Sequence, residues 1–475
     1  MRLPLRLRTV LLASAIPLAL GGCAHYAHYE PRPLAPADSA AAFDARSLAS
    51  PDLRRFLEES LHRDFSAWPR AEWDFEALSW VAFYYNPSLE VARSQWAEAR
   101  GGVTAAGARA NPTVSLVPGY NTNNPTGVSP WLPAISFDIP LSTAGKRGQQ
   151  VDLATFSAEA ARQAVFAEAW RVRAELRAAL IDLDAAGRRS AALRSQADVQ
   201  RRVLSLLEER RAAGAGYAAE SSAARIMLAR SQAAVADADQ LLPLARSRAA
   251  QALGLPVSAL AGIRLDLPAS VSLSADELAA ARRRSLQGRA DVLGALAGYE
   301  ASQHALALEI AKQHPDLHLG PGYQYDQGLD KWTLALTLEL PIFNHNEGPV
   351  AQAEARRGEA AASFTAIQAA AIAEIDGVAA ALAAADGQVR SLEAIQEELA
   401  RQDARIRVRL AAGGADSLEV ETSALDVAAG QIALLDARAQ AARASGQLED
   451  ALQVPLSNFE ALAPASGGAS AQSPP

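Results

Sequence analysis

Two stretches of the chain contain no proline and consist mainly of alanine, leucine, glutamate, glutamine and arginine. They cover residues 141–242 and 350–454. These residue types favour helices, and a break containing glycine within each stretch predicts that the chain turns back there. We therefore expect two long helices, each followed by a shorter returning helix. The expected pairs are Lys146–Arg211 with Ala218–Leu253, and Val350–Ala411 with Leu418–Gln453.

Two further segments, Phe75–Ala110 and Ala275–Gln313, are helical by pattern and nearly match the returning helices in length. The second follows a capping-box sequence from Ser274 to Glu277. Two short helices placed end to end are as long as one long helix. The pattern therefore predicts a tall wall of helices, in which small alanine side chains allow close packing.

Short segments of alternating apolar and polar residues lie before each long helix. They fall within 134–140, 317–325 and 333–340. A period of two predicts strands with one apolar and one polar face, and about 8 to 11 residues suffice for a tilted strand to cross a bilayer. With two strands before each long helix, one chain has too few to close a barrel, and open edges are not stable in lipid. Several copies would pool their strands; a small soluble sheet is the alternative.

The same landmarks occur twice in the same order, about 200 residues apart. The matched segments are 111–120 with 314–323, 135–141 with 336–342, 211–214 with 410–413, and 252–256 with 451–455. This order indicates a tandem duplication rather than a longer array. We expect a first repeat over 52–256 and a second over 257–456, followed by a disordered tail over 457–475.

The N-terminus has the features of a secretory signal peptide over residues 1–22, with three arginines before an apolar run. Cys23, the only cysteine, follows it and resembles the lipidated cysteine of a bacterial lipoprotein; a stray thiol is the alternative. Residues 23–51 would be a lipidated tether. Without the signal, 42 basic residues face 53 acidic ones, which argues against nucleic-acid binding. No run of about 18 apolar residues follows, so any membrane crossing should use strands.

In order and length, these elements resemble the TolC-like outer-membrane efflux family over nearly all of residues 75–456. Asn86-Pro87, Leu141–Arg147 and Leu340–Gly348 are most similar to its heavy-metal branch, the partners of cobalt, zinc and cadmium exporters. That branch usually has Arg and Gln where this chain has His345 and Glu347. The resemblance implies a mainly α fold with a small β part. It also implies a homotrimer with a periplasmic α-barrel and a 12-stranded transmembrane β-barrel, four strands per protomer.

The resemblance further implies a periplasmic adaptor and an inner-membrane pump of the RND type as partners. The adaptor would dock on the tips of the helical hairpins, at Gly214, Gly216, Gly413 and Gly414. The channel would be passive, with metal cations or small toxic compounds as cargo. A type I secretion channel and a pore-free periplasmic lipoprotein scaffold are the alternatives. No phosphate-binding loop, Ser-His-Asp arrangement or cysteine pair occurs in the sequence, so we expect neither an enzyme nor a cofactor.

Two further groups of residues have expected roles in the channel. Rings of acids in a narrowing pore favour cations, and the candidates near the second hairpin tip are Glu397, Glu398, Asp403 and Asp416. Asp403 is preferred, and the alternative is that most of them lie on a solvated helix face. Prolines end strands and glycines permit sharp turns, so the expected strand-to-helix hinges are Pro140, Gly145, Pro341 and Gly348.

Three histidines, His304, His314 and His318, invite comparison with a metal site. His314 precedes Pro315, where the helix should end, so the spacing of four residues that brings two helical ligands together is lost. We expect no metal ligation by this group, and we expect His318 to line the lumen.

Overall fold

The computed structural model describes residues 28–123, 125–266 and 273–455. The chain divides into two units, Met1–Arg46 and Ser47–Pro475. In the first unit, helix α2 covers Pro36–Asp44 and begins with proline, whose missing N–H has no partner in a first helical turn anyway. The signal region, Cys23 and the C-terminal tail after residue 455 lie outside the described residues.

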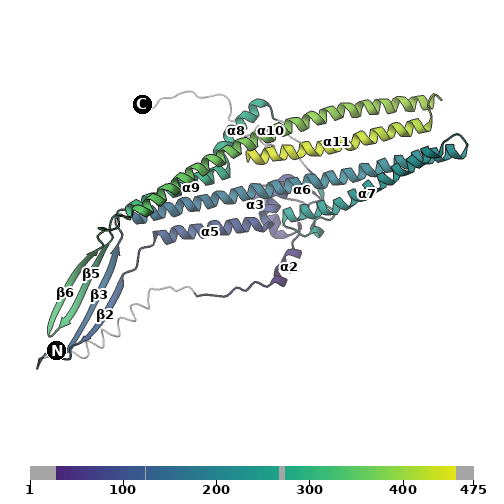
Figure 1. Cartoon of the computed structure of the whole chain (residues 1–475). Helices are drawn as coiled ribbons and strands as arrows, with labels where there is room; N and C mark the ends of the chain where they lie inside the picture. Colours follow the sequence, from purple (N-terminus) through teal and green to yellow (C-terminus); the bar gives the residue numbers. More distant parts are fainter. Residues whose placement is uncertain (1–27, 124, 267–272, 456–475) are drawn as a thin grey trace, which may run out of the picture. The chain divides into compact units, whose positions relative to one another are not determined.

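The second unit contains one order of elements twice: a helix, a two-stranded hairpin, a long helix and a returning helix (Figure 1). The first set comprises α5 Pro87–Gly107, β2 Thr113–Tyr120, β3 Trp131–Leu141, α6 Lys146–Ala212 and α7 Ala218–Leu253. The second set comprises α9 Ala290–Ala311, β5 Leu317–Asp326, β6 Leu329–Leu338, α10 Glu347–Ala411 and α11 Ser417–Leu452. The expected mainly α fold with a small sheet is confirmed.

The long helices α6 and α10 contain 67 and 65 residues, about 100 Å each. α6 contacts α5 and α7 as well as α9 and α11, and α10 contacts α9 and α11. Two short helices in succession therefore accompany each long helix, as the lengths predicted (Figure 1). α10 begins three residues before its expected start.

The expectation of uninterrupted helices over 75–110 and 275–313 is wrong, because each segment forms two helices. α4 Phe75–Tyr85 ends before α5, and α8 Ala275–Gly288 ends before α9. Asn86 has an extended backbone, as a residue before proline prefers, and its side chain caps α5 by accepting a hydrogen bond from the Ser88 N–H at 3.0 Å. Arg289 takes the same extended conformation between α8 and α9.

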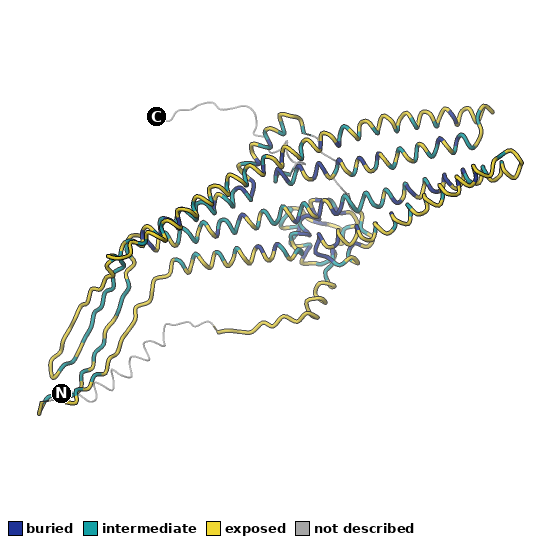
Figure 2. The backbone as a smooth tube through the Cα atoms, viewed as in Figure 1, coloured by how far each residue is buried: buried dark blue, intermediate teal, exposed yellow. Residues whose placement is uncertain are grey.

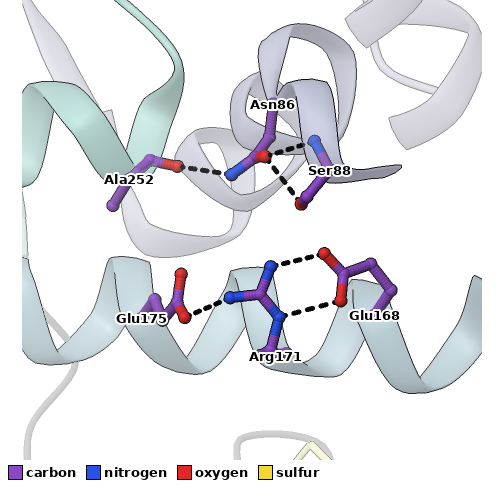
Figure 3. A network of polar contacts seen from close by, with 6 residues as sticks. All are labelled: Asn86, Ser88, Glu168, Arg171, Glu175 and Ala252. Carbon is purple, nitrogen blue, oxygen red and sulfur yellow. Dashed lines mark hydrogen bonds and ion pairs between the residues drawn. The ribbon is translucent and has the colours of Figure 1, made fainter. Parts of the chain in front are cut away.

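Both helix breaks dock on the end of a returning helix. The Asn86 Nδ2 donates to the carbonyl of Ala252 near the end of α7 at 3.4 Å (Figure 3). The buried Arg289 guanidinium donates to the carbonyl of Ala451 near the end of α11. Two unrelated side chains thus make the same connection in the two halves. On α6, Arg171 pairs with Glu168 and Glu175 (Figure 3).

The main apolar core surrounds the middle of α6 (Figure 2). α3 Pro51–Leu61, η1 Val257–Leu260 and a parallel pair of β1 Glu72–Asp74 with β4 Arg264–Asp266 lie in this region. Trp73 on β1 is fully buried there, as are Leu57 and Leu176. A smaller cluster joins α8, α10 and α11 and includes Ile375 and Leu448.

A group of buried ionic side chains joins α6 to α11. Arg177 donates to a Glu449 carboxylate oxygen at 2.7 Å, to an Asp450 oxygen at 3.0 Å and to the carbonyl of Gly446 at 2.8 Å. Arg173 also pairs with Glu449. Burial raises the pKa of Asp450 to about 6, while Arg177 acts against that shift. These contacts hold the first half of the unit against the second.

Among the described helices, α10 alone is long and apolar enough to cross a membrane by length and composition, with a window of mean hydropathy 1.5 that is 17% buried. This corrects the expectation that no such segment exists. The reason is alanine, since residues 360–385 are mostly alanine and contain only two charged residues. One such helix does not by itself indicate a span, and α10 packs on α8, α9 and α11.

Candidate channel wall and hairpin tips

The four strands β2, β3, β5 and β6 form one antiparallel sheet in the order β2-β3-β5-β6 (Figure 1). The central pair, β3 and β5, joins the two halves of the unit, with Ile135 opposite Tyr323 and Pro140 opposite His318. Within the described residues, β2 and β6 each have one unpaired edge. Such edges are unstable in lipid and call for a partner strand.

The register sorts the side chains onto two faces, because opposite residues point to the same side of a sheet. One face is apolar and open, with Leu116 70% exposed, Leu334 71% and Trp332 81%. Its other members include Val114, Ile135, Phe137, Ile139, Leu319, Leu336 and Leu338. The opposite face is mainly polar and includes Thr113, Ser115, Ser136, Asp138, His318, Gln324, Lys331, Thr333 and Thr337. The predicted alternation is confirmed.

Each hairpin carries a Tyr–Trp pair on the apolar face, in the half of the hairpin that contains the connecting turn. The rings of Tyr120 and Trp131 lie 5.0 Å apart, and those of Tyr323 and Trp332 lie 4.9 Å apart. Tyr and Trp prefer the boundary between hydrocarbon and water. From Trp131 to Leu141 the strand rises roughly 33 Å, which at a tilt of about 40° spans about 25 Å, the height of an apolar band in membrane barrels.

The sequence analysis did not identify these aromatic pairs. The available signal was a tyrosine before and a tryptophan after the turn of each hairpin, in equivalent places of the two repeats. Tyr120 and Trp131 flank the first loop directly, whereas Tyr323 and Trp332 each lie four residues from the second turn. The loops themselves differ in length. The first covers residues 121–130, whereas Gln327 and Gly328, both with positive φ, form a two-residue turn.

Two of the four expected hinge positions need correction. Pro140 does not end its strand, since β3 continues to Leu141. β2 no longer accompanies β3 at this point, and proline is tolerated at such an edge. Gly145 does hold the left-handed position before α6, with φ 72°, but its counterpart before α10 is Asn346, with φ 61°. Asparagine also tolerates the left-handed conformation, so Asn346 can take the position expected for a glycine. Gly348 itself lies inside α10.

Lys146 fixes the junction between the sheet and the helices. Its Nζ is buried and donates to the His314 carbonyl at 2.5 Å and to an Asp316 oxygen at 2.9 Å. The N–H of Thr143 donates to the same carboxylate oxygen of Asp316 at 2.9 Å. β3 and β5 are therefore held together where they leave the sheet. Beyond β6, the chain reaches α10 through Pro341 without a comparable lysine.

The two hairpin tips have the same construction. Gly214 and Gly413 both adopt φ 75°, and a Cβ at either position would meet open space. Asp416 caps α11 by accepting a hydrogen bond from the Glu419 N–H at 2.8 Å, and it pairs with Arg210 at the end of α6. The backbone hydrogen bond, followed by Arg210, lowers the pKa of Asp416. Asp416 thus connects one tip to the other. The docking role of the tips, including Gly216 and Gly414, stays a prediction.

Arginines accompany the remaining acids near the second tip. Glu397 and Glu398 both pair with Arg401 at 3.2 Å, and Glu398 also pairs with Arg405 at 2.9 Å. The sequence analysis omitted these partners, although a separation of three or four residues on a helix indicates the two pairs with Arg401. Glu397 and Glu398 on this helix are therefore not free carboxylates of the kind that a simple acidic ring would require.

Asp403 occupies a different environment from the two glutamates. It follows Gln396 and Leu399 on the face of α10 that packs toward α11, and its side chain is only 16% exposed. One carboxylate oxygen accepts from Arg407 at 2.6 Å, while the other is buried without a hydrogen-bond partner. This geometry favours a position between the helices, and its predicted place in the lumen stays a prediction.

The three histidines do not lie together. His304 stacks on Phe156, and its Nδ1 lies 2.9 Å from Gln149, whereas the carbonyl of His314 accepts from Lys146. His318 lies on the polar face of the sheet, next to Asp138. Among the described residues, no group of three or more His, Cys, Asp or Glu side chains is arranged to hold a metal ion.

The sequence matches known proteins over part of its length. Residues 82–255 match the family model of the outer membrane efflux protein. The cobalt-zinc-cadmium resistance protein CzcC of Cupriavidus metallidurans is 24% identical over 275 residues, which are 58% of this chain and 64% of that relative. The aligned region therefore spans just under two thirds of the relative's length.

The fold matches solved structures of outer-membrane proteins over most of the chain. VceC of Vibrio cholerae gives a TM-score of 0.65 at 22% identity, covering 80% of this chain and 95% of that one. The outer-membrane channel OprN gives 0.67 at 19% identity, covering 90% and 98%. Residues 82–255 thus match the outer membrane efflux protein family, and the chain has the fold of the solved outer-membrane proteins VceC and OprN.

Proposed function

We propose that this protein is the outer-membrane channel of a tripartite efflux system and passively conducts divalent metal cations out of the cell. The four-stranded sheet is the observation that carries the proposal. It combines an apolar face bounded by Tyr–Trp pairs, a mainly polar face and two unpaired edges among the described residues. A sheet of this kind suits a barrel wall between lipid and water.

Closure of the barrel requires further copies of the chain. Three copies of four strands give twelve, with β6 of one protomer beside β2 of the next. The helices α5, α6, α7 and α9 to α11 would continue the wall into the periplasm. A homotrimer satisfies both open edges of each sheet, whereas a monomer leaves them exposed to lipid.

The arrangement of the tips and the name of one relative support the proposed partners and cargo. The hairpin tips, crossed by the Arg210–Asp416 pair, would dock a periplasmic adaptor that connects the channel to an inner-membrane pump of the RND type. The name of CzcC, a cobalt-zinc-cadmium resistance protein, supports divalent cations as cargo. Cys23, if acylated, would add a lipid anchor in the same membrane.

The test is to purify the full-length protein from outer membranes in mild detergent and to measure its oligomeric mass and its conductance in planar bilayers. A trimer that forms cation-selective channels is the expected result. A monomer without conductance would contradict the proposal and would favour a periplasmic scaffold. A trimeric channel that exports a polypeptide when its neighbouring secretion genes are present would instead support a secretion role.

A further inference from the structure

Asp138 and His318 form a close pair on the polar face of the sheet. Asp138 lies on β3 and His318 on β5, and the His318 Nδ1 lies 3.0 and 3.1 Å from the two carboxylate oxygens of Asp138. Thr113 on β2 is opposite Asp138, and Thr337 on β6 is opposite His318. A polar row therefore crosses all four strands at this level.

The surroundings of the pair leave it open to solvent. The side chains of Asp138 and His318 are 50% and 43% exposed. The next two positions of β5 that point to the polar face after His318 are Gly320 and Gly322, which add no side chain on that face. A hydrated ion can thus approach both groups from the polar face.

Among the described residues, no lysine or arginine forms an ion pair with Asp138. Its partner His318 is charged only when protonated. The other ion pair on the face, Lys331 with Asp326 at 2.5 Å, is internally neutral. The Lys331–Asp326 pair lies beyond Gln324, and Gln324 itself is about 20 Å along β5 from His318. The Asp138–His318 pair therefore offers carboxylate oxygens and an imidazole nitrogen in one place.

Carboxylate oxygen and imidazole nitrogen are ligands of divalent transition metals, with bonds of about 2.1 Å. Two ligand atoms 3.0 Å apart that each bind at this distance subtend about 90° at the metal, the angle of octahedral coordination. The existing separation would therefore need little change to hold an ion whose remaining ligands are water.

We propose that Asp138 and His318 form a low-affinity site for a hydrated divalent transition-metal cation, one per protomer, on the polar face of the sheet. The proposal rests on the proposed function in one respect, that this face lines the conducting lumen. Only two protein ligands hold the ion, so it exchanges readily. Conduction needs this, because an ion must bind well enough to enter and weakly enough to leave.

The test is to record potassium currents through the full-length channel in planar bilayers while cobalt(II) chloride is added. Cobalt should reduce the wild-type current, and His318→Gln and Asp138→Asn should each raise the half-blocking concentration at least tenfold by removing one of two ligands. His304→Gln is the matched control, since it removes a histidine on α9 away from the sheet, and its block should equal that of the wild type.

Two outcomes separate this inference from the proposed function. A channel that conducts potassium but shows the same cobalt block in the wild type and in both sheet variants would overturn the site and leave the channel intact. Absence of potassium current in the wild type would instead contradict the proposed function. Equilibrium dialysis with cobalt should independently show that each sheet variant binds one ion fewer per chain than the wild type; equal binding would also overturn the site.

Discussion

The charge of Asp450 opposes folding at neutral pH, and Asp450→Asn should reveal by how much. Asp450 lies on α11 beside Glu449 and faces Arg173 and Arg177 of α6. Its side chain is 22% exposed. Burial is the largest influence on its pKa, which rises from 3.8 to about 6, and the two arginines only partly offset that effect.

The direction of the effect follows from the two pKa values. A carboxyl group with a raised pKa in the folded state stabilises the fold fully below pH 3.8, and this stability is lost as the pH rises through about 6. The difference between these two pKa values corresponds to about 3 kcal/mol. Asparagine keeps the shape but cannot ionise. The variant should therefore gain about 3 kcal/mol relative to the wild type between pH 4 and pH 7.

Thermal unfolding in detergent at several pH values, followed by circular dichroism, measures this difference. For 475 residues the entropy of unfolding is roughly 1 kcal/mol per kelvin, so the midpoint should shift by about 3 °C. Asp184→Asn is the matched control, because Asp184 is an exposed acid that pairs with Arg188 on α6. A difference between Asp450→Asn and the wild type that does not vary with pH would refute the reasoning. It would show that the arginines fully compensate for burial.

Three further changes test the backbone, the tip charges and the anchor. Gly254→Ala should destabilise the protein by about 3 kcal/mol, measured by thermal unfolding, because Gly254 has φ 70° and a Cβ would lie 2.7 Å from the Tyr85 carbonyl oxygen. Arg401→Gln should raise the cation selectivity of the channel, measured by reversal potential, because it frees Glu397. Cys23→Ser should abolish lipid labelling, measured by mass spectrometry of the mature N-terminus.

Each of these predictions has a control or a contrary result. Gly413→Ala has a similar φ but open space around the new Cβ, so it should cost only about 1 to 2 kcal/mol; equal losses would mean that contact with Tyr85 is unimportant. Unchanged selectivity in Arg401→Gln would place these acids outside the conducting path. A wild-type N-terminus without acyl groups would disprove the anchor.

The helices could be predicted well where the sequence contains a sustained signal. The proline-free, alanine-rich stretches identified α6, α7, α10 and α11 nearly to the residue, because helix propensity adds up over many positions. The break at Arg289 could not be found in this way. No proline marks it, and the arginine is held by a carbonyl 162 residues away in sequence.

The residues of the candidate channel wall were predictable only in part, because some of their contacts depend on distant parts of the chain. Alternation identified both faces of the sheet, since side-chain direction is a local property of a strand. The pairing of Asp138 with His318 depends on the register between β3 and β5, which local sequence does not specify. Likewise, the position of Asp403 between α10 and α11 depends on how the two helices pack, which local sequence does not specify. The prediction that Asp403 lines the lumen used only its acidity and its place near the second tip.

The alanine-rich part of α10 has a consequence for the export of the protein across the inner membrane. A secreted chain must pass the inner membrane without stopping there, yet residues 360–385 approach the composition of a stop-transfer segment. Glu374 and Asp376 are its only charges, and acids near the centre of a helix oppose insertion by about 3 kcal/mol each. After folding, the same acids pair with Arg289 and Arg282 at 2.9 and 3.0 Å. In an exported chain, these two side chains would therefore oppose arrest of the segment in the membrane, and in the folded protein they pair α10 with Arg289 and Arg282.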